Sequence, residues 1–353
     1  MTGLRAWATG MLLLVALPCA AQTSRVALDA VAAADIGRGS QVPRRATMWV
    51  DLFGAVRLAE GLDLRVRPVV FRRTFDGEWR TQMYELALRY ERPGTIGVRV
   101  DAGQFTSPIG LGLLENRPNR NPVVSQHSTL YLPTPRLEAG TPTTFLLAAA
   151  YPLGAKITVS GAKWDARAAI VDSSPIRVRP FFGDNKPPRM RNLVAGIGVT
   201  PYVGLRVGVA AASGSYAAES EVRDPARGDR RATVFQAEAE WAFRHTRIAG
   251  EWLWTQRQLA AQDATVDGGW IEATQTITPR WFGAVRVDEQ WTRWIGASEV
   301  RQRSSYRRLE TAVGFRLTPD IALRAAFMTR KGYVVNFWDD QILASIVFAK
   351  KLL

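Results

Sequence analysis

The chain has almost no cysteine and almost no histidine. Its 353 residues include one cysteine, Cys19, and two histidines, His127 and His245. The common zinc sites need several such ligands, so a transition-metal site of that kind is excluded. Phosphate-loop and dinucleotide-binding motifs in a strand–helix context are absent as well. We therefore expect no metal and no other cofactor.

The chain also has no apolar run long enough for a transmembrane helix. Residues 11–17 are apolar but short, with Arg5 before them and the small residues Cys19-Ala20-Ala21 after them. This order is typical of a secretory signal peptide. We expect residues 1–21 to be a signal peptide and residues 22–353 to form one domain that contains no cysteine; a buried N-terminal helix is the alternative.

Lysine is scarce, although the chain is basic. There are 46 lysines and arginines against 32 acidic residues, and only six of these cations are lysines. A basic chain often binds nucleic acid, but an exported chain without a helical basic stripe does not fit that class, so no nucleic-acid partner is expected. A GC-rich genome or a water-filled lumen that attracts anions explains the arginines instead.

The chain is rich in stretches of about ten residues that alternate between apolar and polar side chains. Near its C-terminal end, Leu309, Val313 and Phe315 alternate with charged or small residues. Such a repeat is typical of transmembrane β-strands, and in lipid these strands must close into a barrel because every backbone polar group needs a partner. A soluble β-sandwich also alternates, but it needs neither so charged a face nor so many strands in one domain.

Alternation and turn residues predict an all-β fold, a transmembrane antiparallel barrel of about 16 strands. The predicted strands are residues 24–34, 47–57, 62–72, 81–91, 95–105, 143–151, 155–165, 190–199, 204–213, 231–243, 247–258, 268–277, 281–291, 305–317, 321–330 and 340–350. The predicted short turns are residues 59–61, 92–94, 152–154, 200–202, 244–246, 278–280 and 318–320. Bacterial barrels of one chain have an even strand count with short periplasmic turns, and this parity requires the weak, alanine-rich strand 24–34.

The parity of each strand separates two faces. Apolar residues predicted to face lipid are Val50, Leu52, Val56, Leu62, Leu64, Val66, Leu86, Leu88, Ile96, Val98, Val100, Ile157, Val159, Leu205, Val207 and Val209. Charged residues predicted to face the lumen include Asp51, Asp63, Glu85 and Lys156. Aromatic residues near the strand ends, among them Tyr84, Tyr90, Phe235, Phe243, Trp252 and Trp281, indicate interfacial girdles, although sheets favour aromatic residues in any case.

One predicted loop, residues 106–142, is far longer than the others. A loop of this length in a compact domain is usually functional or disordered. It follows Gly103-Gln104-Phe105 and opens Thr106-Ser107-Pro108-Ile109-Gly110. Here the chain resembles the trimeric porins of Gram-negative bacteria, and loosely the phosphate-selective porin group, in which the third loop folds into the barrel. The resemblance implies an outer-membrane homotrimer, each barrel a passive diffusion channel with an inward-folding loop.

Charges on this loop and on the facing wall are expected to set ion selectivity. The candidate residues of the pore and its constriction are Arg57, Arg65, Arg67, Arg89, Arg99, Asp101, Glu115, Arg117, Arg120, Arg136, Arg206, Arg286 and Arg324. We expect an anion-leaning pore for small hydrophilic solutes, in which replacing Arg65 and Arg67 with alanine lowers anion preference. A weakly selective pore, with acids and bases paired across strands, is the alternative.

Two other functions compete with a channel. A non-conducting barrel could act as a scaffold or adhesin, because arginine-rich outer loops such as residues 220–231 and 301–303 could bind lipopolysaccharide or a partner, although charged runs are more often simply solvated. A membrane hydrolase would need a serine–histidine group; His127 lies between Ser125 and Ser128, and His245 lies in a tight turn. Closeness in sequence is weak evidence for catalysis, so no enzyme activity is expected.

Overall fold

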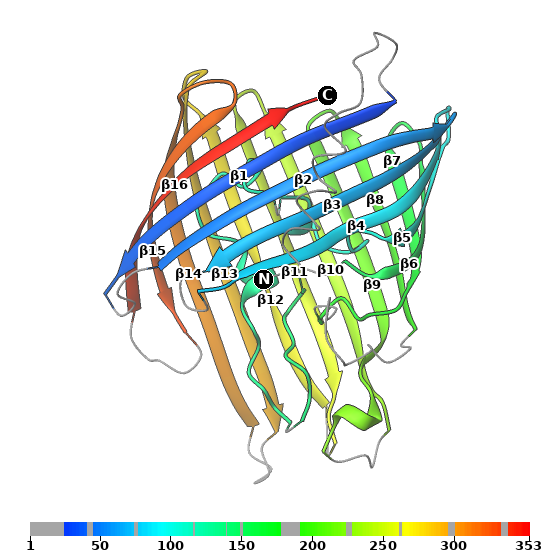
Figure 1. Cartoon of the computed structure of the whole chain (residues 1–353). Helices are drawn as coiled ribbons and strands as arrows, with labels where there is room; N and C mark the ends of the chain where they lie inside the picture. The colour runs from blue at the N-terminus through cyan, green and yellow to red at the C-terminus, as the bar shows by residue number, and fades with distance from the viewer. Residues whose placement is uncertain are drawn as a thin grey trace.

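A computed structural model describes residues 25–40, 45–73, 77–115, 117–138, 140–148, 151–177, 191–223, 228–260, 263–295, 301–332 and 338–353. Within these ranges the chain forms one closed barrel of 16 antiparallel strands, in which each strand pairs with its neighbours in sequence and β1 pairs with β16 (Figure 1). The strands are β1 Val26–Gly39, β2 Arg45–Ala59, β3 Leu62–Arg73, β4 Trp79–Arg92, β5 Gly97–Gln104, β6 Leu153–Ser160, β7 Trp164–Val171, β8 Asn192–Tyr202, β9 Leu205–Ala217, β10 Arg230–Phe243, β11 Thr246–Gln258, β12 Asp263–Thr276, β13 Trp281–Ile295, β14 Arg301–Arg316, β15 Ile321–Lys331 and β16 Trp338–Lys351. No helix in these ranges has the length and apolar character needed to cross a membrane.

The predicted barrel and its strand count are confirmed. The weak stretch predicted at residues 24–34 is part of β1, which closes the barrel by pairing Ala32 with Phe348 of β16 and with Val50 of β2. Short turns join the strands at one end of the barrel, which we call the turn end, and longer connections lie at the other, the loop end. The predicted signal peptide lies outside the described residues.

The predicted strand at residues 143–151 and the turn at 152–154 are wrong. The strand predicted at 155–165 is present as β6, which begins at Leu153 and ends at Ser160, and β7, which begins at Trp164, was not predicted. Residues 143–148 belong to the long loop, and Leu146, Leu147 and Ala148 have no exposed surface. This apolar run resembles a lipid-facing strand in sequence, but it is buried inside the barrel. Gly154 stands in β6, where a Cβ would lie 2.1 Å from the carbonyl oxygen of Ile170, so its glycine marks a close backbone approach rather than a turn.

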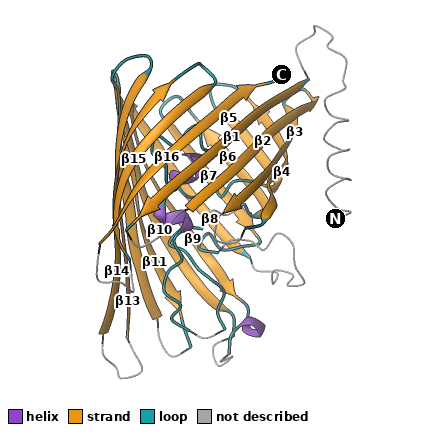
Figure 2. Cartoon of the chain, turned by 60° about the vertical axis from the view of Figure 1, so that its left-hand side comes forward, coloured by secondary structure: helices purple, strands orange, loops and turns teal. Residues whose placement is uncertain are grey.

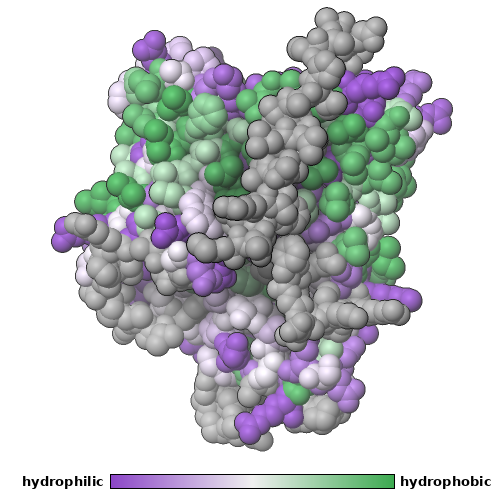
Figure 3. Space-filling model, viewed as in Figure 1, coloured by the Kyte–Doolittle hydropathy of each residue, from purple (hydrophilic) through white to green (hydrophobic). Residues whose placement is uncertain are grey.

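The predicted division into an outer and an inner face is confirmed for side chains whose exposed fraction is large. Leu86, Leu88, Ile157 and Val209 are 49%, 44%, 43% and 55% exposed on the outer side. Figure 3 shows hydrophobic side chains gathered over the strands and hydrophilic ones toward the two ends of the molecule. Burial of one apolar parity in lipid, rather than in a core, is therefore what the alternation encodes.

Tyr84 departs from the predicted girdle. It is 3% exposed and stacks on Tyr151 of the long loop, with 3.9 Å between ring centroids. The cause is a bulge, because Arg67 of β3 pairs with Glu85 whereas the next residue, Pro68, pairs with Met83. A bulge places an extra residue in one strand and reverses the side on which the neighbouring side chains point, which turns Tyr84 inward.

Gly204 is expected to be required for the turn between β8 and β9. Its φ is +92°, and a Cβ there would lie 2.2 Å from the carbonyl oxygen of Ala242. We expect Gly204→Ala to lower the thermal unfolding temperature of the folded barrel, with about 1–2 kcal/mol from the left-handed backbone and a further loss from the clash. Gly228→Ala is the matched control, since its φ is +61° but nothing lies within 4 Å. Equal losses in both variants would contradict the role of the close approach.

Candidate functional site: a loop held inside the barrel

The connection between β5 and β6 folds into the barrel and is longer than predicted, spanning residues 105–152. It contains two short helices, η1 Gly112–Glu115 and α2 Ser128–Tyr131, and Figure 2 shows helices within the ring of strands. An apolar cluster anchors it to the inner wall. The cluster joins Ile109, Leu113, Leu130, Leu146 and Leu147 of the loop to Val234, Leu253 and Val266 of β10, β11 and β12.

Carboxylates of the wall bind the loop backbone. Glu251 of β11 accepts a hydrogen bond of 2.6 Å from the Leu111 N–H. Glu310 of β14 accepts bonds of 2.9 Å from the N–H groups of Val124 and Ser125, and another from the Ser125 hydroxyl. In β13, Asp288 accepts both the N–H and the hydroxyl of Ser128, at 3.0 and 2.9 Å. These acids satisfy backbone donors that an irregular loop would otherwise bury without partners.

Arginines of the wall bind the carbonyl groups of the same loop. Arg324 of β15 donates to the carbonyl oxygens of Pro118 and Val123, at 3.1 and 2.8 Å, and to that of Asn121. Arg257 of β11 donates to Thr134 Oγ1 at 2.6 Å, Thr144 Oγ1 at 2.8 Å and the Phe145 carbonyl oxygen at 2.5 Å. Wall charges therefore fix the loop in place through its main chain, rather than only facing charged loop side chains across a gap as predicted.

Arg286 of β13 lies at the centre of this network and has no exposed surface. Its guanidinium lies 3.5, 3.8 and 3.7 Å from carboxylate oxygens of Glu272, Asp288 and Glu310. It also donates to the Ser125 carbonyl oxygen and lies 3.1 Å from His127 Nε2. Arg286 thus lies among three buried carboxylates and touches the loop, and it shares Asp288 with Arg308 and Glu272 with Arg247.

His127 is a structural residue of the loop. Its ring lies 4.3 Å from the Trp270 ring, and burial together with the neighbouring Arg286 holds the pKa of His127 well below its usual range. A neutral imidazole can accept a hydrogen bond from Arg286. The hydroxyls of Ser125 and Ser128 bind Glu310 and Asp288, so neither is shown donating to His127 as a nucleophile would.

Most of the other predicted arginines are paired with acids. Arg67 binds Asp51 at 2.7 Å, Arg89 binds Asp101 at 2.6 Å, and Arg206 binds Glu238 at 2.5 Å. Asp101 also lies 3.8 Å from Arg99 and 3.2 Å from Lys156, which makes it the centre of a second network. Arg117 of the loop pairs with Asp29 and Asp51, at 2.5 and 3.5 Å.

The remaining candidates have other surroundings. Arg57 has a side chain that is 62% exposed and lies 3.9 Å from Asp63, and Arg65 lies over the Phe53 ring at 5.1 Å. Arg120 and Arg136 are exposed on the loop, and the side chain of Glu115 lies outside the described part of the structure. The structure therefore brings Arg286 and Arg324 together around the loop, and Arg67 and Arg117 around Asp51, but it does not gather all thirteen candidates.

Two hollows lie on opposite sides of the loop. The loop-end basin, about 440 Å³, is lined by Arg45, Arg308 and Arg330 with Asp35 as the one carboxylate among its lining residues. The turn-end basin, about 540 Å³, is lined by Arg120, Arg244, Arg247, Arg316 and Arg324 with Asp320 as its one carboxylate. Pro118 lines both, so this part of the loop separates them.

Arg45 differs from its neighbours in the loop-end basin. Arg308 binds Asp288 at 2.8 Å and Arg330 binds Asp339 at 3.0 Å. Among the described residues no carboxylate forms an ion pair with Arg45. Its charge therefore acts on whatever enters the basin. Arg45 was not predicted, because it precedes the alternating part of its strand. Arg257 was not predicted either, because in the sequence it looks like any other arginine of an alternating strand.

The sequence-based prediction for Arg65 and Arg67 becomes more specific. Asp51 has no exposed surface and depends on Arg67, whereas Arg65 contacts an aromatic ring. We expect Arg67→Ala to lower the anion preference of the channel more than Arg65→Ala does, because the first change leaves a buried carboxylate partly uncompensated. Reversal potentials of the two single variants in a salt gradient measure this. An equal or opposite order would contradict the pairing.

Comparisons with known proteins identify the fold of this chain but do not assign it to a family. No family model matches the chain, and no curated protein matches it. The chain is similar in structure to OmpF of Salmonella typhi, solved with daunomycin, with a TM-score of 0.64 and 10% identity over 92% of this chain and 97% of that one. It is similar to an anion-selective porin of Comamonas acidovorans (TM-score 0.60, 11% identity, 92% and 99% covered). A third is OmpT, an outer-membrane protein of Vibrio cholerae (TM-score 0.61, 7% identity, 93% and 99% covered). At these identities the likeness shows a shared barrel fold.

Proposed function

We propose that this chain is an outer-membrane porin, a passive diffusion channel for small hydrophilic solutes that favours anions. The observation that carries the proposal is the pair of basins on either side of the loop, each lined by several guanidinium groups and a single carboxylate. Rings of like charge select ions at close range. The phosphate-selective group is not singled out by any of these residues.

The arginines that are paired with carboxylates add little to this preference for anions. Arg67, Arg89 and Arg206 each lie against a carboxylate, so they add little net field. The selective charges are therefore those of the basins, with Arg45 first among them. This reading combines the two sequence-based alternatives, since the middle of the wall is salt-bridged while its two ends are basic.

The location follows from the same features. Strands with an apolar outer parity and a polar inner parity suit a bilayer, and the barrels similar to this one include outer-membrane proteins. Together with the predicted signal peptide at residues 1–21, this supports the outer membrane of a Gram-negative bacterium. The proposed partners are its lipid and lipopolysaccharide, two further copies in a homotrimer, and the permeating solutes. No enzyme activity is part of the proposal.

Solute uptake tests this function. The chain of residues 22–353, folded into liposomes, should let them swell in glucose, faster in gluconate and more slowly in protonated glucosamine at matched osmolarity. The three solutes are similar in size, so the order reports charge. Swelling that is fastest for glucosamine would contradict the anion preference and leave the channel in place.

A non-conducting barrel is the second candidate. The feature that favours it is the long loop, whose residues Ile109, Leu130 and Leu147 have no exposed surface inside the barrel. A plugged barrel could serve as a scaffold or adhesin through its outer loops. Correctly folded protein that gives no swelling with any of the three solutes would favour this candidate over the porin.

A further inference from the structure

Three aromatic side chains line the loop-end basin together with its arginines. Trp49 comes from β2, Tyr131 from the end of α2 and Tyr306 from β14. Trp49 and Tyr306 are 5% and 4% exposed, so each shows only a small part of its ring to the basin. The Trp49 ring also stacks on Phe71, with 5.6 Å between ring centroids. These rings are therefore packed in place before any solute enters.

The loop places the third ring, that of Tyr131, in the basin. Its helix α2 begins at Ser128, whose N–H and hydroxyl both bind Asp288 of the wall. Leu130 of the same helix has no exposed surface, and the Tyr131 N–H donates to the His127 carbonyl oxygen at 3.2 Å. The contacts that hold the loop inside the barrel therefore also hold this ring in the basin.

The basin has one cation whose charge is not offset by a neighbouring carboxylate. Arg308 and Arg330 are each paired with an aspartate, at 2.8 and 3.0 Å. Asp35, the one carboxylate among the lining residues, lies 4.0 Å from Arg324. Among the described residues no carboxylate forms an ion pair with Arg45. The basin therefore suits a solute that has a single negative charge.

We infer that the loop-end basin is a binding site for an aromatic monocarboxylate, a solute with one planar ring and one carboxylate. The inference rests on the proposed function as an anion-leaning channel and names a class of solute for it. The carboxylate would bind Arg45, because a guanidinium can hold a carboxylate through two parallel hydrogen bonds. The ring would lie beside Trp49, Tyr131 and Tyr306, since aromatic rings attract one another at short range. The basin volume of about 440 Å³ is in the range of small-molecule sites.

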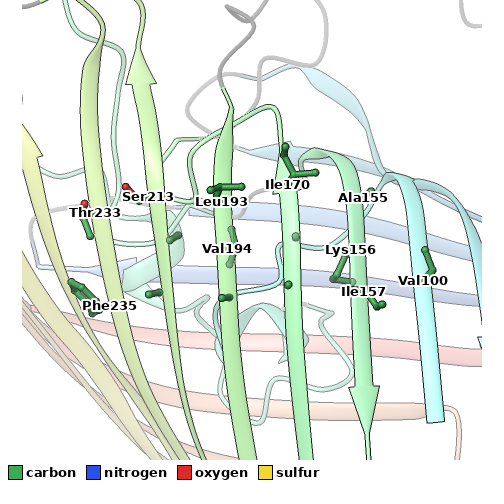
Figure 4. A pocket seen from close by; sticks show the side chains of 15 residues that line it. Val100, Ala155, Lys156, Ile157, Ile170, Leu193, Val194, Ser213, Thr233 and Phe235 are labelled. Atoms are coloured by element: carbon green, nitrogen blue, oxygen red, sulfur yellow. The ribbon is translucent and has the colours of Figure 1, made fainter. Parts of the chain in front are cut away.

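Two other hollows each lack one half of this combination. The turn-end basin has five arginines, but Phe282 is the one Phe, Tyr or Trp among its lining residues. The hollow over β5 to β10, about 760 Å³, has Phe235 but no arginine among its lining residues, and Figure 4 shows mostly apolar side chains there. An inorganic anion such as phosphate needs only cations, and a neutral sugar would leave Arg45 without a counter-charge. The loop-end basin matches a solute that has both a ring and a charge.

Block of the potassium chloride current by two ring acids tests the site. Benzoate and cyclohexanecarboxylate are both anions at neutral pH and have the same number of ring carbons, but only benzoate is aromatic. We expect both to interrupt the current through wild-type barrels, with a half-blocking concentration about twofold to tenfold lower for benzoate. Equal half-blocking concentrations would overturn the inference, and so would phosphate that blocks better than benzoate.

Four variants separate the ring from the charge. Trp49→Leu and Tyr131→Leu should each lower the advantage of benzoate over cyclohexanecarboxylate. Phe282→Leu removes a ring from the turn-end basin, so it is the matched control and should keep that advantage. Arg45→Gln should weaken the binding of both acids by a similar factor. If the advantage of benzoate survives both ring variants of the loop-end basin, the proposed site is wrong.

A readout without current separates the site from the channel. A solute that binds the folded barrel raises its unfolding temperature, so benzoate should stabilise the wild-type barrel and Arg45→Gln should remove that stabilisation. Barrels that pass no current but are stabilised by benzoate in this way would contradict the channel and leave the site in place. Conducting barrels that benzoate neither blocks nor stabilises would overturn the site and leave the channel in place.

Discussion

Replacing Arg286 with alanine should shift the channel toward cations and loosen its loop. The guanidinium has no exposed surface and lies within 3.8 Å of three carboxylates, those of Glu272, Asp288 and Glu310. Removing one partner of a buried ion pair costs about 3–5 kcal/mol when the remaining charge has no other partner. Here Asp288 keeps Arg308 at 2.8 Å and Glu272 keeps Arg247 at 3.7 Å, so the loss falls mainly on Glu310 and on the loop. We expect a lower unfolding temperature, higher and noisier single-channel conductance, and a lower ratio of anion to cation permeability.

Two variants make the result interpretable. Arg316→Ala removes the same charge from an exposed position in the turn-end basin, where Arg316 donates to the Pro279 carbonyl oxygen, and should leave the loop and the unfolding temperature nearly unchanged. Arg286→Lys keeps the charge but cannot reproduce the planar set of donors, and should retain selectivity while losing part of the stability. An Arg286→Ala barrel that is as stable and as quiet as Arg316→Ala would contradict the proposed network.

Reversing the charge at Arg45 should change selectivity with little effect on stability. Among the described residues Arg45 has no paired carboxylate, so its field reaches solutes in the loop-end basin. At about 7 Å in water, a change of two unit charges raises the energy of a passing anion by about 1 kcal/mol and lowers that of a cation by the same amount, so the permeability of each changes about fivefold to tenfold in opposite directions. The reversal potential of Arg45→Glu in a potassium chloride gradient measures this shift.

The control for Arg45 lies on the outer side of the wall. Arg307 of β14 pairs with Glu289 at 2.7 Å and its side chain is 55% exposed. Its neighbour in sequence, Arg308, lines the basin, so the two arginines share a height but not a face. We expect Arg307→Glu to leave the reversal potential unchanged. A shift as large as that of Arg45→Glu would mean that overall charge, rather than the basin, sets selectivity.

The sequence was sufficient to predict the barrel, because lipid imposes a simple constraint on every strand. Alternation with a period of two and an even strand count predicted sixteen strands, including the weak one that became β1. The constraint fails where a segment leaves the wall. Leu146 and Leu147 are as apolar as any lipid-facing pair, yet they pack inside the barrel, and only the tertiary structure distinguishes the two environments.

The candidate site was harder to predict for a related reason. Alternation places an arginine on the inner face but does not say what it binds there. Arg67 and Arg206 prove to be paired across strands, Arg324 binds carbonyl groups of a loop some 200 residues away in sequence, and in the described part of the chain no ion pair joins Arg45 to a carboxylate. Every residue has the same backbone carbonyl group, so the sequence does not show which carbonyl groups an arginine binds. The role of the wall charges in holding the loop could therefore not be predicted.

The first measurement we would make is the current through purified wild-type barrels in a planar bilayer under a tenfold potassium chloride gradient. Potassium and chloride have similar mobilities in water, so the reversal potential reports the charge of the pathway itself. We expect stepwise conductance with a reversal potential displaced toward that of chloride, as two arginine-lined basins require. A displacement toward potassium would contradict the role of the basins, and folded barrels that give no conductance steps would contradict the channel itself.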